Sequence, residues 1–226
     1  MAKVLFTAIV AEMRNKLNGN VFSKNRGGNY LRNKVTPVNP NTTYQADQRA
    51  TLSAHSAGWR GLTQAQRDAW NDAAASFPYT DIFGNVKILS GQQLYVKLNT
   101  NLSNIGEANI SDPPTPVAVP LVTPTAATAA AGGAKTVTIS PATVPTGYTL
   151  VVWASPSVSP GISFMKNKVR FLGEFTVTSG VATITTAYNA RFGDVVAGQK
   201  VEFRTVLISN DSGQQGVPSS IQIIAT

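Results

Sequence analysis

The stretch Lys200–Ser209, KVEFRTVLIS, has the composition of a long β-strand, because β-branched and aromatic residues fill most of its positions. Similar runs surround it, and we predict strands at residues 135–140, 148–155, 169–178, 181–186 and 219–225, with a weaker edge strand at 161–165. Ser179-Gly180 and Asp211-Ser212-Gly213 are typical hairpin turns. Seven short strands within residues 135–226 indicate an immunoglobulin-like β-sandwich.

Residues 43–110 have the periodicity of helices instead. Thr63 with Gln66 forms a capping-box sequence at one helix start, and Ser90 is a suitable N-cap for a later helix. We predict three helices, with Trp59 packing against Trp70 and the lone His55 at the edge of their core. The apolar residues at helical spacing give the candidate core of this module, Leu52, Trp59, Trp70, Phe77, Leu94 and Leu98.

Residues 111–134 differ from both neighbours in composition. They hold five of the 13 prolines of the chain, seven alanines and four threonines, without lysine or arginine. This composition predicts an extended linker. The predicted fold class is therefore α+β and multidomain, with a basic β-hairpin arm at 1–42, a helical module at 43–110, the linker at 111–134 and the sandwich at 135–226.

The positive charge of the chain is concentrated at its start. The net charge is +8, and the first 35 residues hold seven basic residues and one acidic residue, a local charge of +6. Two β-capable runs, 20–24 and 29–35, flank the turn sequence Asn25-Arg26-Gly27-Gly28, which predicts a hairpin. Strand alternation places Tyr30, Arg32 and Lys34 on one face. The candidate docking residues are Lys24, Arg26, Tyr30, Arg32 and Lys34.

Three roles for this arm stay open. It can add a strand to a neighbouring subunit, bind a nucleic-acid backbone, or remain a free surface hairpin. We favour the first of these, because a like-charged arm gains most from an acidic protein surface.

The apolar run at residues 4–11 is near the lower limit for a signal peptide. Glu12, Arg14 and Lys16 follow it without a small-residue cleavage site, which favours a strand or helix packed on the rest of the protein. No stretch reaches the roughly 20 apolar residues of a membrane span. We therefore expect synthesis in the cytoplasm and no membrane partner.

The residues available for chemistry are few. The chain has 0 cysteines, 1 histidine and 11 acidic residues, and the acidic residues show no metal-ligand or acid and base spacing. We expect no enzymatic activity, catalytic residue, metal site or cofactor. Trp153 is expected in the core of the sandwich, and an exposed platform for stacking a sugar is the alternative.

Three motifs occur together in the first part of the chain. They are GNVFSKNRGGNYLR at 19–32, TPVNPNT at 36–42 and LTQAQRDAW at 62–70, with Gln45, Arg49 and Trp59-Arg60 between them. In combination they resemble a family of virion structural proteins of tailed bacteriophages of Bacteroidota hosts, crAss-like phages included. The match covers about residues 14–100, and the motifs supply no active-site residue.

The resemblance implies a non-enzymatic protein present in many copies on the virion. We expect a capsid auxiliary or decoration protein of the head surface, which docks through its N-terminal half and projects the sandwich. The expected partners are the major capsid protein or head-to-tail connector proteins, together with further copies of the chain. A head-to-tail or tail component, a head fibre, a module that binds host glycans, and a nucleic-acid-binding protein are the alternatives, the last the least favoured.

Overall fold

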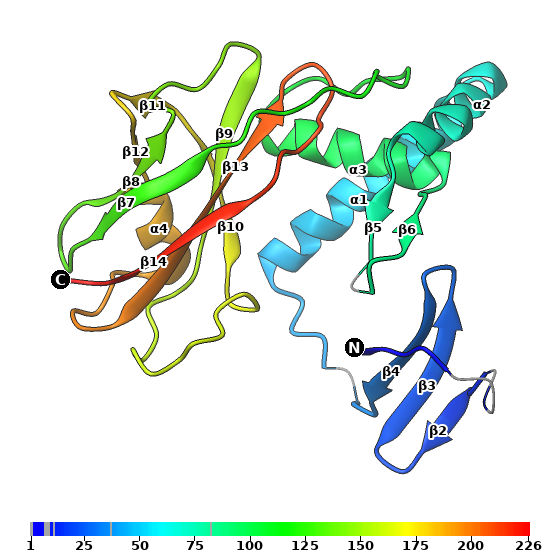
Figure 1. The fold of residues 1–226 in the computed structure, drawn as a ribbon, viewed down its shortest axis with the longest axis horizontal. Helices are drawn as coiled ribbons and strands as arrows, with labels where there is room; N and C mark the ends of the chain where they lie inside the picture. Colours follow the sequence, from blue (N-terminus) through cyan, green and yellow to red (C-terminus); the bar gives the residue numbers. More distant parts are fainter. Residues whose placement is uncertain (1, 7–9, 11, 37, 82) are drawn as a thin grey trace.

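The computed structural model describes residues 2–6, 10, 12–36, 38–81 and 83–226. These residues form helices and several antiparallel sheets, which confirms the prediction of an α+β fold (Figure 1). Three parts follow one another along the chain: a small N-terminal sheet, a group of helices, and two larger sheets.

The N-terminal sheet has four strands in the order β1-β4-β3-β2. They are β1 (Ala2–Lys3), β2 (Asn15–Leu17), β3 (Asn20–Asn25) and β4 (Gly28–Asn33). The hairpin β3–β4 turns at Gly28, whose φ of 108° favours glycine. Residues 7–9, 11 and 37 lie outside the described part of the chain, so the predictions for residues 4–11 and for the break at Pro37 fall partly outside it.

The helical part follows this sheet in the chain, after residues 34–42. Its elements are α1 (Thr43–Gly61), α2 (Gln64–Ala73), the 3-10 helix η1 (Ala74–Ser76), β5 (Tyr79–Thr80), β6 (Val86–Lys87) and α3 (Gly91–Asn104). Thr63 and Gln66 form the capping box predicted for α2, and Ser90 caps α3 with Gln93. The Arg67 guanidinium donates to the Leu62 carbonyl oxygen at 2.8 Å, which fixes the turn between α1 and α2.

The core of the helices corrects one prediction. Trp70, Leu94 and Leu98 are buried and Trp59 and Phe77 are half-buried, but Leu52 is 56% exposed, so its assignment to the core is wrong. The reason is that the side of α1 with His55 and Trp59 faces α3, whereas Leu52 lies at the edge of this helix contact. Trp59 packs against the buried cluster that contains Trp70, and the Tyr95 ring lies beside both tryptophans, with centroid distances of 5.7 and 5.4 Å.

Two four-stranded antiparallel sheets form the last part of the chain. Their orders are β10-β9-β13-β14 and β11-β12-β8-β7. Residues of both sheets, among them Val137, Leu150 and Phe203, share one apolar core. The elements are β7 (Thr123–Ala129), β8 (Lys135–Ser140), β9 (Tyr148–Ala154), β10 (Arg170–Phe175), β11 (Val177–Thr178), β12 (Val181–Thr183), α4 (Thr185–Phe192), β13 (Lys200–Ser209) and β14 (Ser219–Ile224).

Three strand predictions in this part differ from the structure. The strand predicted at 169–178 is divided into β10 and β11, which belong to different sheets. Residues 161–165 form no strand, and the strand predicted at 181–186 ends at Thr183 because α4 begins at Thr185. The side chains that face the core from this segment are spaced at i, i+4 and i+8, namely Ile184, Tyr188 and Phe192. This is the spacing of a helix, and it is visible in the sequence.

Part of the segment predicted as an extended linker, 111–134, belongs to a sheet instead. Residues 123–129 are β7, which pairs with β8 at the edge of its sheet, a position that tolerates Pro124. The residues before β7 are held by side chains of distant elements. Trp70 Nε1 donates to the Ser111 carbonyl oxygen at 2.8 Å, and Gln214 Nε2 donates to the Thr115 carbonyl oxygen at 2.7 Å. This segment therefore joins the helices to the sheets along a fixed path.

The helices and the two sheets form one packed unit, residues 43–226, which we call the body. Leu102 of α3 and Ile105, which follows α3, pack on Val151, Val206 and Ile208 of the sheet β10-β9-β13-β14. Asn101 Nδ2 also donates to the Gly213 carbonyl oxygen at 2.8 Å. Because α3 contributes to the helical core and to this contact, the helices cannot swing freely against the sheets.

Replacing Gly213 by alanine tests this contact. A Cβ atom at Gly213 would lie 2.3 Å from the Leu98 carbonyl oxygen, and the φ of 68° disfavours any side chain. We expect the free energy of unfolding to fall by about 2 to 4 kcal/mol, the sum of overpacking and a left-handed backbone. Urea unfolding measures the loss. Gly198→Ala is the control, because Gly198 has a φ of 78° and open space around it; equal losses would contradict a close contact between α3 and the turn.

Candidate docking surface

The strand register gathers basic side chains on one face of the N-terminal sheet. Residues opposite each other in an antiparallel pair lie on the same face. Lys3 is opposite Tyr30, and Lys16 and Arg32 are both opposite Val21. The Lys34 amide donates to the Gly19 carbonyl oxygen, which continues the pairing beyond β4. We call this side, with Lys3, Lys16, Tyr30, Arg32 and Lys34, the basic face.

The opposite side of the sheet carries apolar side chains. Phe22 is opposite Leu31, and both are only half-buried, while Leu17 of β2 is 57% exposed. Of the side chains that the structure describes in residues 3–42, none is buried. A sheet without a core of its own gains stability when a further surface covers it.

The five predicted docking residues do not all lie together. Tyr30, Arg32 and Lys34 share the basic face, whereas Arg26 lies in the exposed turn before Gly28 and Lys24 lies opposite Asn29 on the other face. Lys24 Nζ is 3.8 Å from a carboxylate oxygen of Glu12. A hydrogen bond from Arg14 holds the pKa of Glu12 below its usual value, and the charges of Arg14 and Lys24 act in the same direction.

Lys3 and Lys16 belong to the basic face but were not among the predicted docking residues. A signal for Lys16 was present in the sequence: Asn18-Gly19 is a typical two-residue hairpin loop, and it joins β2 to β3. Asn18 has a φ of 50°, as such a turn requires. Lys3 reaches the face only through the pairing of β1 with β4, a long-range contact that no local pattern announces.

The sheet lies apart from the body, below α1 and the β5–β6 hairpin in Figure 1. Two polar contacts help to place it. Lys3 Nζ lies 3.6 Å from Asp81 Oδ2, and the Arg49 guanidinium donates to Asn39 Oδ1 at 2.8 Å and to Asn41 Oδ1 at 3.1 Å. The second contact folds the segment before α1 back onto the helix. The motif at 36–42 together with Arg49 thus helps to set the direction in which the sheet leaves the body.

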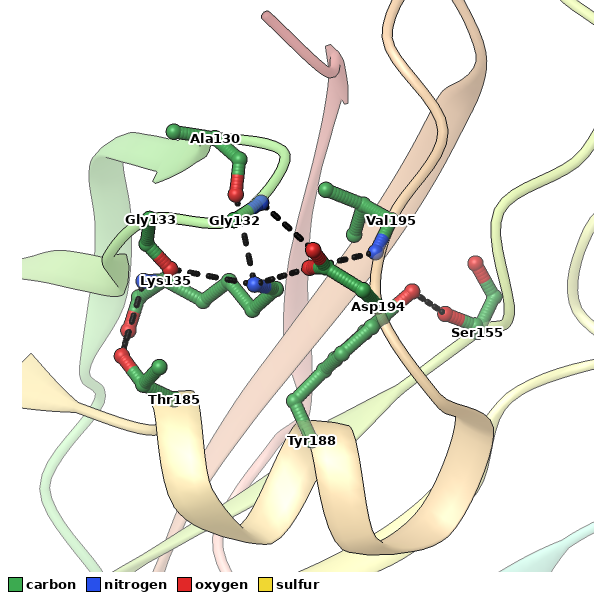
Figure 2. A network of polar contacts seen from close by, with 9 residues as sticks. All are labelled: Ala130, Gly132, Gly133, Lys135, Ser155, Thr185, Tyr188, Asp194 and Val195. Atoms are coloured by element: carbon green, nitrogen blue, oxygen red, sulfur yellow. Dashed lines mark hydrogen bonds and ion pairs between the residues drawn. The ribbon is translucent and has the colours of Figure 1, made fainter.

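The body holds a buried polar network (Figure 2). The side chain of Lys135 is fully buried, and its Nζ lies 2.6 Å from Asp194 Oδ1 and donates to the carbonyl oxygens of Ala130 and Gly133. The Tyr188 hydroxyl donates to the Ser155 carbonyl oxygen at 3.0 Å. Burial raises the pKa of Tyr188 to about 12, and the Asp194 charge adds to the effect. The network ties the β7–β8 turn to the loop after α4.

Replacing Asp194 by alanine should lower the melting temperature more than replacing Lys135 by methionine. The first change leaves an ammonium group buried without a counter-charge, whereas the second leaves a carboxylate whose side chain is 44% exposed and can be hydrated. Circular dichroism at pH 7 measures both effects. Equal melting temperatures for the two variants would contradict the network.

The Asp194 contribution also depends on pH. The hydrogen bond from Lys135, followed by the Gly132 amide, lowers the pKa of Asp194. A carboxyl group with a lowered folded-state pKa stabilises the protein above its unfolded-state pKa, near 4, and this stability is lost as the pH falls through the folded-state value. The difference between wild type and Asp194→Ala should therefore shrink on acidification.

Further features of the described residues bear on function. They contain no group of three His, Cys, Asp or Glu side chains placed to hold a metal ion. None of the helices in the described part of the chain is long and apolar enough to cross a bilayer. His55 is 3% exposed and its Nε2 lies 3.2 Å from Ser103 Oγ; burial lowers its pKa. Trp153 is half-buried, edge-on to the Phe171 ring.

Comparisons with known proteins give no relative for this chain: no family model, curated protein or solved structure matches it.

Proposed function

We propose that the chain is a non-enzymatic structural protein of a tailed-phage virion, and that it docks through its N-terminal sheet. The observation that carries the proposal is a four-stranded sheet in which no described side chain of residues 3–42 is buried and one face is basic. The resemblance of the motifs at 19–32, 36–42 and 62–70 to virion proteins agrees with this role. So does the position of the sheet outside the body (Figure 1).

The charge of the basic face selects the kind of partner. Lys16, Arg32 and Lys34 contribute three exposed positive groups, Lys3 is engaged by Asp81, and the one acidic residue of the first 35, Glu12, is engaged by Arg14 and Lys24. An acidic surface of the major capsid protein, or of a connector protein, is complementary to such a face. A nucleic-acid partner is less well supported, because single-strand binding sites stack successive bases on several aromatic rings and this face has one, Tyr30.

The body then forms the projecting part of the protein. Its two antiparallel sheets around one core support an immunoglobulin-like arrangement, which we propose for residues 123–226. Because α3 and residues 111–122 attach the helices to these sheets, the projecting part moves as a unit rather than on a tether. We place it on the head surface as a capsid auxiliary or decoration protein in many copies; a head-to-tail or tail position is the alternative.

Mass spectrometry of particles of the encoding phage, purified on a density gradient, tests this proposal. We expect the chain to co-purify with the major capsid protein at many copies per particle and to remain after a wash that removes soluble host proteins. Absence from the particles, with the chain present in the infected-cell lysate, would contradict the proposed function.

A further inference from the structure

A fixed array of planar polar groups lies on the outer face of the sheet β10-β9-β13-β14. Along β13, Val201 and Phe203 point into the core, so Glu202 and Arg204 point to the opposite side. Glu202 is only 4% exposed, and its carboxylate accepts hydrogen bonds from Arg204 at 3.2 Å and from Gln222 Nε2 at 3.0 Å. Glu202 and Gln222 are directly opposite across β13 and β14. Their mutual bonds hold the groups in place before any ligand arrives.

These groups line a hollow that the helices leave uncovered. Further along β13, Val206 and Ile208 are covered by α3, but the row of Glu202 and Arg204 lies beyond that cover. The hollow measures about 400 Å³, and Phe164 and Lys166 of the loop before β10 border it. Phe164 is 64% exposed. The aromatic ring of Phe164 thus lies beside the polar side chains of Glu202 and Gln222, and this combination is found in sites for small polar ligands.

A second hollow adjoins the first. Trp153 is directly opposite Arg204 in the pairing of β9 with β13, so the two side chains are neighbours on the same face. Trp153 lines a hollow of about 280 Å³, together with Gln48 of α1 and Asn104 of α3. The Trp153–Arg204 pair therefore lies between two hollows on the same face of the sheet, each with an aromatic side chain and at least one side-chain amide.

We propose that these hollows bind an acidic oligosaccharide. The C–H faces of sugar rings are apolar and stack on aromatic rings such as Phe164 and Trp153, while the hydroxyl groups bond to planar polar groups such as Glu202 and Gln222. Adjacent hollows suit consecutive sugar units. The borders carry three positive residues, Lys166, Arg170 and Arg204, against the single carboxylate of Glu202, which favours a saccharide that bears carboxylates.

The experiment uses the full chain and measures retardation by polysaccharides in native affinity electrophoresis. Hyaluronan, alginate and polygalacturonate are the acidic probes and dextran is the neutral probe. We expect at least one acidic probe to retard the wild-type chain, and Phe164→Ala to weaken that binding by roughly tenfold or more. Since Phe164 is largely exposed, the variant should unfold at the wild-type temperature. Phe83→Ala, which removes an aromatic residue that is 41% exposed elsewhere, is the matched control and should bind as the wild type does.

The basic face requires its own control, because it attracts polyanions as well. A chain with Lys16→Gln, Arg32→Gln and Lys34→Gln should retain binding if the hollows are the site. Loss of binding in this triple variant, wild-type binding by Phe164→Ala, or no binding to any probe would overturn the proposal. If dextran binds as well as the acidic probes, the inference that the ligand bears carboxylates is wrong. None of these results bears on docking in the virion, which rests on the N-terminal sheet.

Discussion

A chain with Lys16, Arg32 and Lys34 replaced by glutamine should bind its particle roughly 10- to 100-fold more weakly than the wild type. This range follows from three ion pairs at about 0.5 to 1 kcal/mol each. All three side chains are exposed and lie on the basic face, so their loss should not unfold the protein. Salt screens such contacts, and raising the ionic strength should weaken wild-type binding more than variant binding.

The matched control for this variant removes the same charge from the body. Lys87, Lys97 and Lys168 replaced by glutamine give the same net charge with an intact basic face. Co-sedimentation of each purified chain with particles that lack it measures the affinity. Equal weakening by both triple variants would show that overall charge, and not the basic face, governs attachment.

Replacing Trp70 by alanine should lower the free energy of unfolding by about 3 to 5 kcal/mol, the usual cost of removing a large buried aromatic residue. Trp70 is 0% exposed, its ring meets the Tyr95 ring edge-on, and its Nε1 donates to the Ser111 carbonyl oxygen. The change thus opens a cavity and also releases the segment that leads to β7.

Urea unfolding followed by circular dichroism gives the size of the Trp70 effect. Trp59→Ala is the comparison, since Trp59 borders the same Tyr95 ring but is only half-buried and should cost less. If the two variants lose the same stability, Trp70 does not hold the helical core together in the way its burial indicates.

Local signals explain which parts of the fold could be predicted. The starts of α2 and α3 follow from Thr63 and Ser90, whose side chains cap the helix within three residues. The strand at Lys200–Ser209 is also as predicted, because its residues favour a strand at nearly every position. Here the local preference and the fold agree.

The parts that were missed depend on distant partners. Pro124 and the alanines of β7 have little strand preference, and β7 forms because β8 supplies its hydrogen bonds. Leu52 fits a helical apolar stripe, but α3 covers the neighbouring side of α1. The periodicity of a helix identifies an apolar side without showing how far a partner extends across it.

The docking surface was predictable in part for the same reason. Alternation along β4 places Tyr30 and Arg32 together, and it needs no partner strand. Lys3 joins them because β1 pairs with β4, and Lys16 because β2 pairs with β3. Lys24 lies on the opposite face because of the register between β3 and β4. The side of a sheet on which a charge lies follows from register, which is set by turns and distant strands. The same alternation applies to β13, where Glu202 and Arg204 alternate with the core residues Val201 and Phe203. Once the strand is predicted, this pattern places both charged side chains on the outer face.

An electron-microscopy map of the phage particle at side-chain resolution is the most direct test of the proposed docking. We expect the chain on the particle, with Lys16, Arg32 and Lys34 against an acidic surface of a capsid or connector subunit, and with the two larger sheets projecting outward. A particle in which the basic face is open to solvent while the sheets are seated on the shell would contradict the account, as would a particle without the chain.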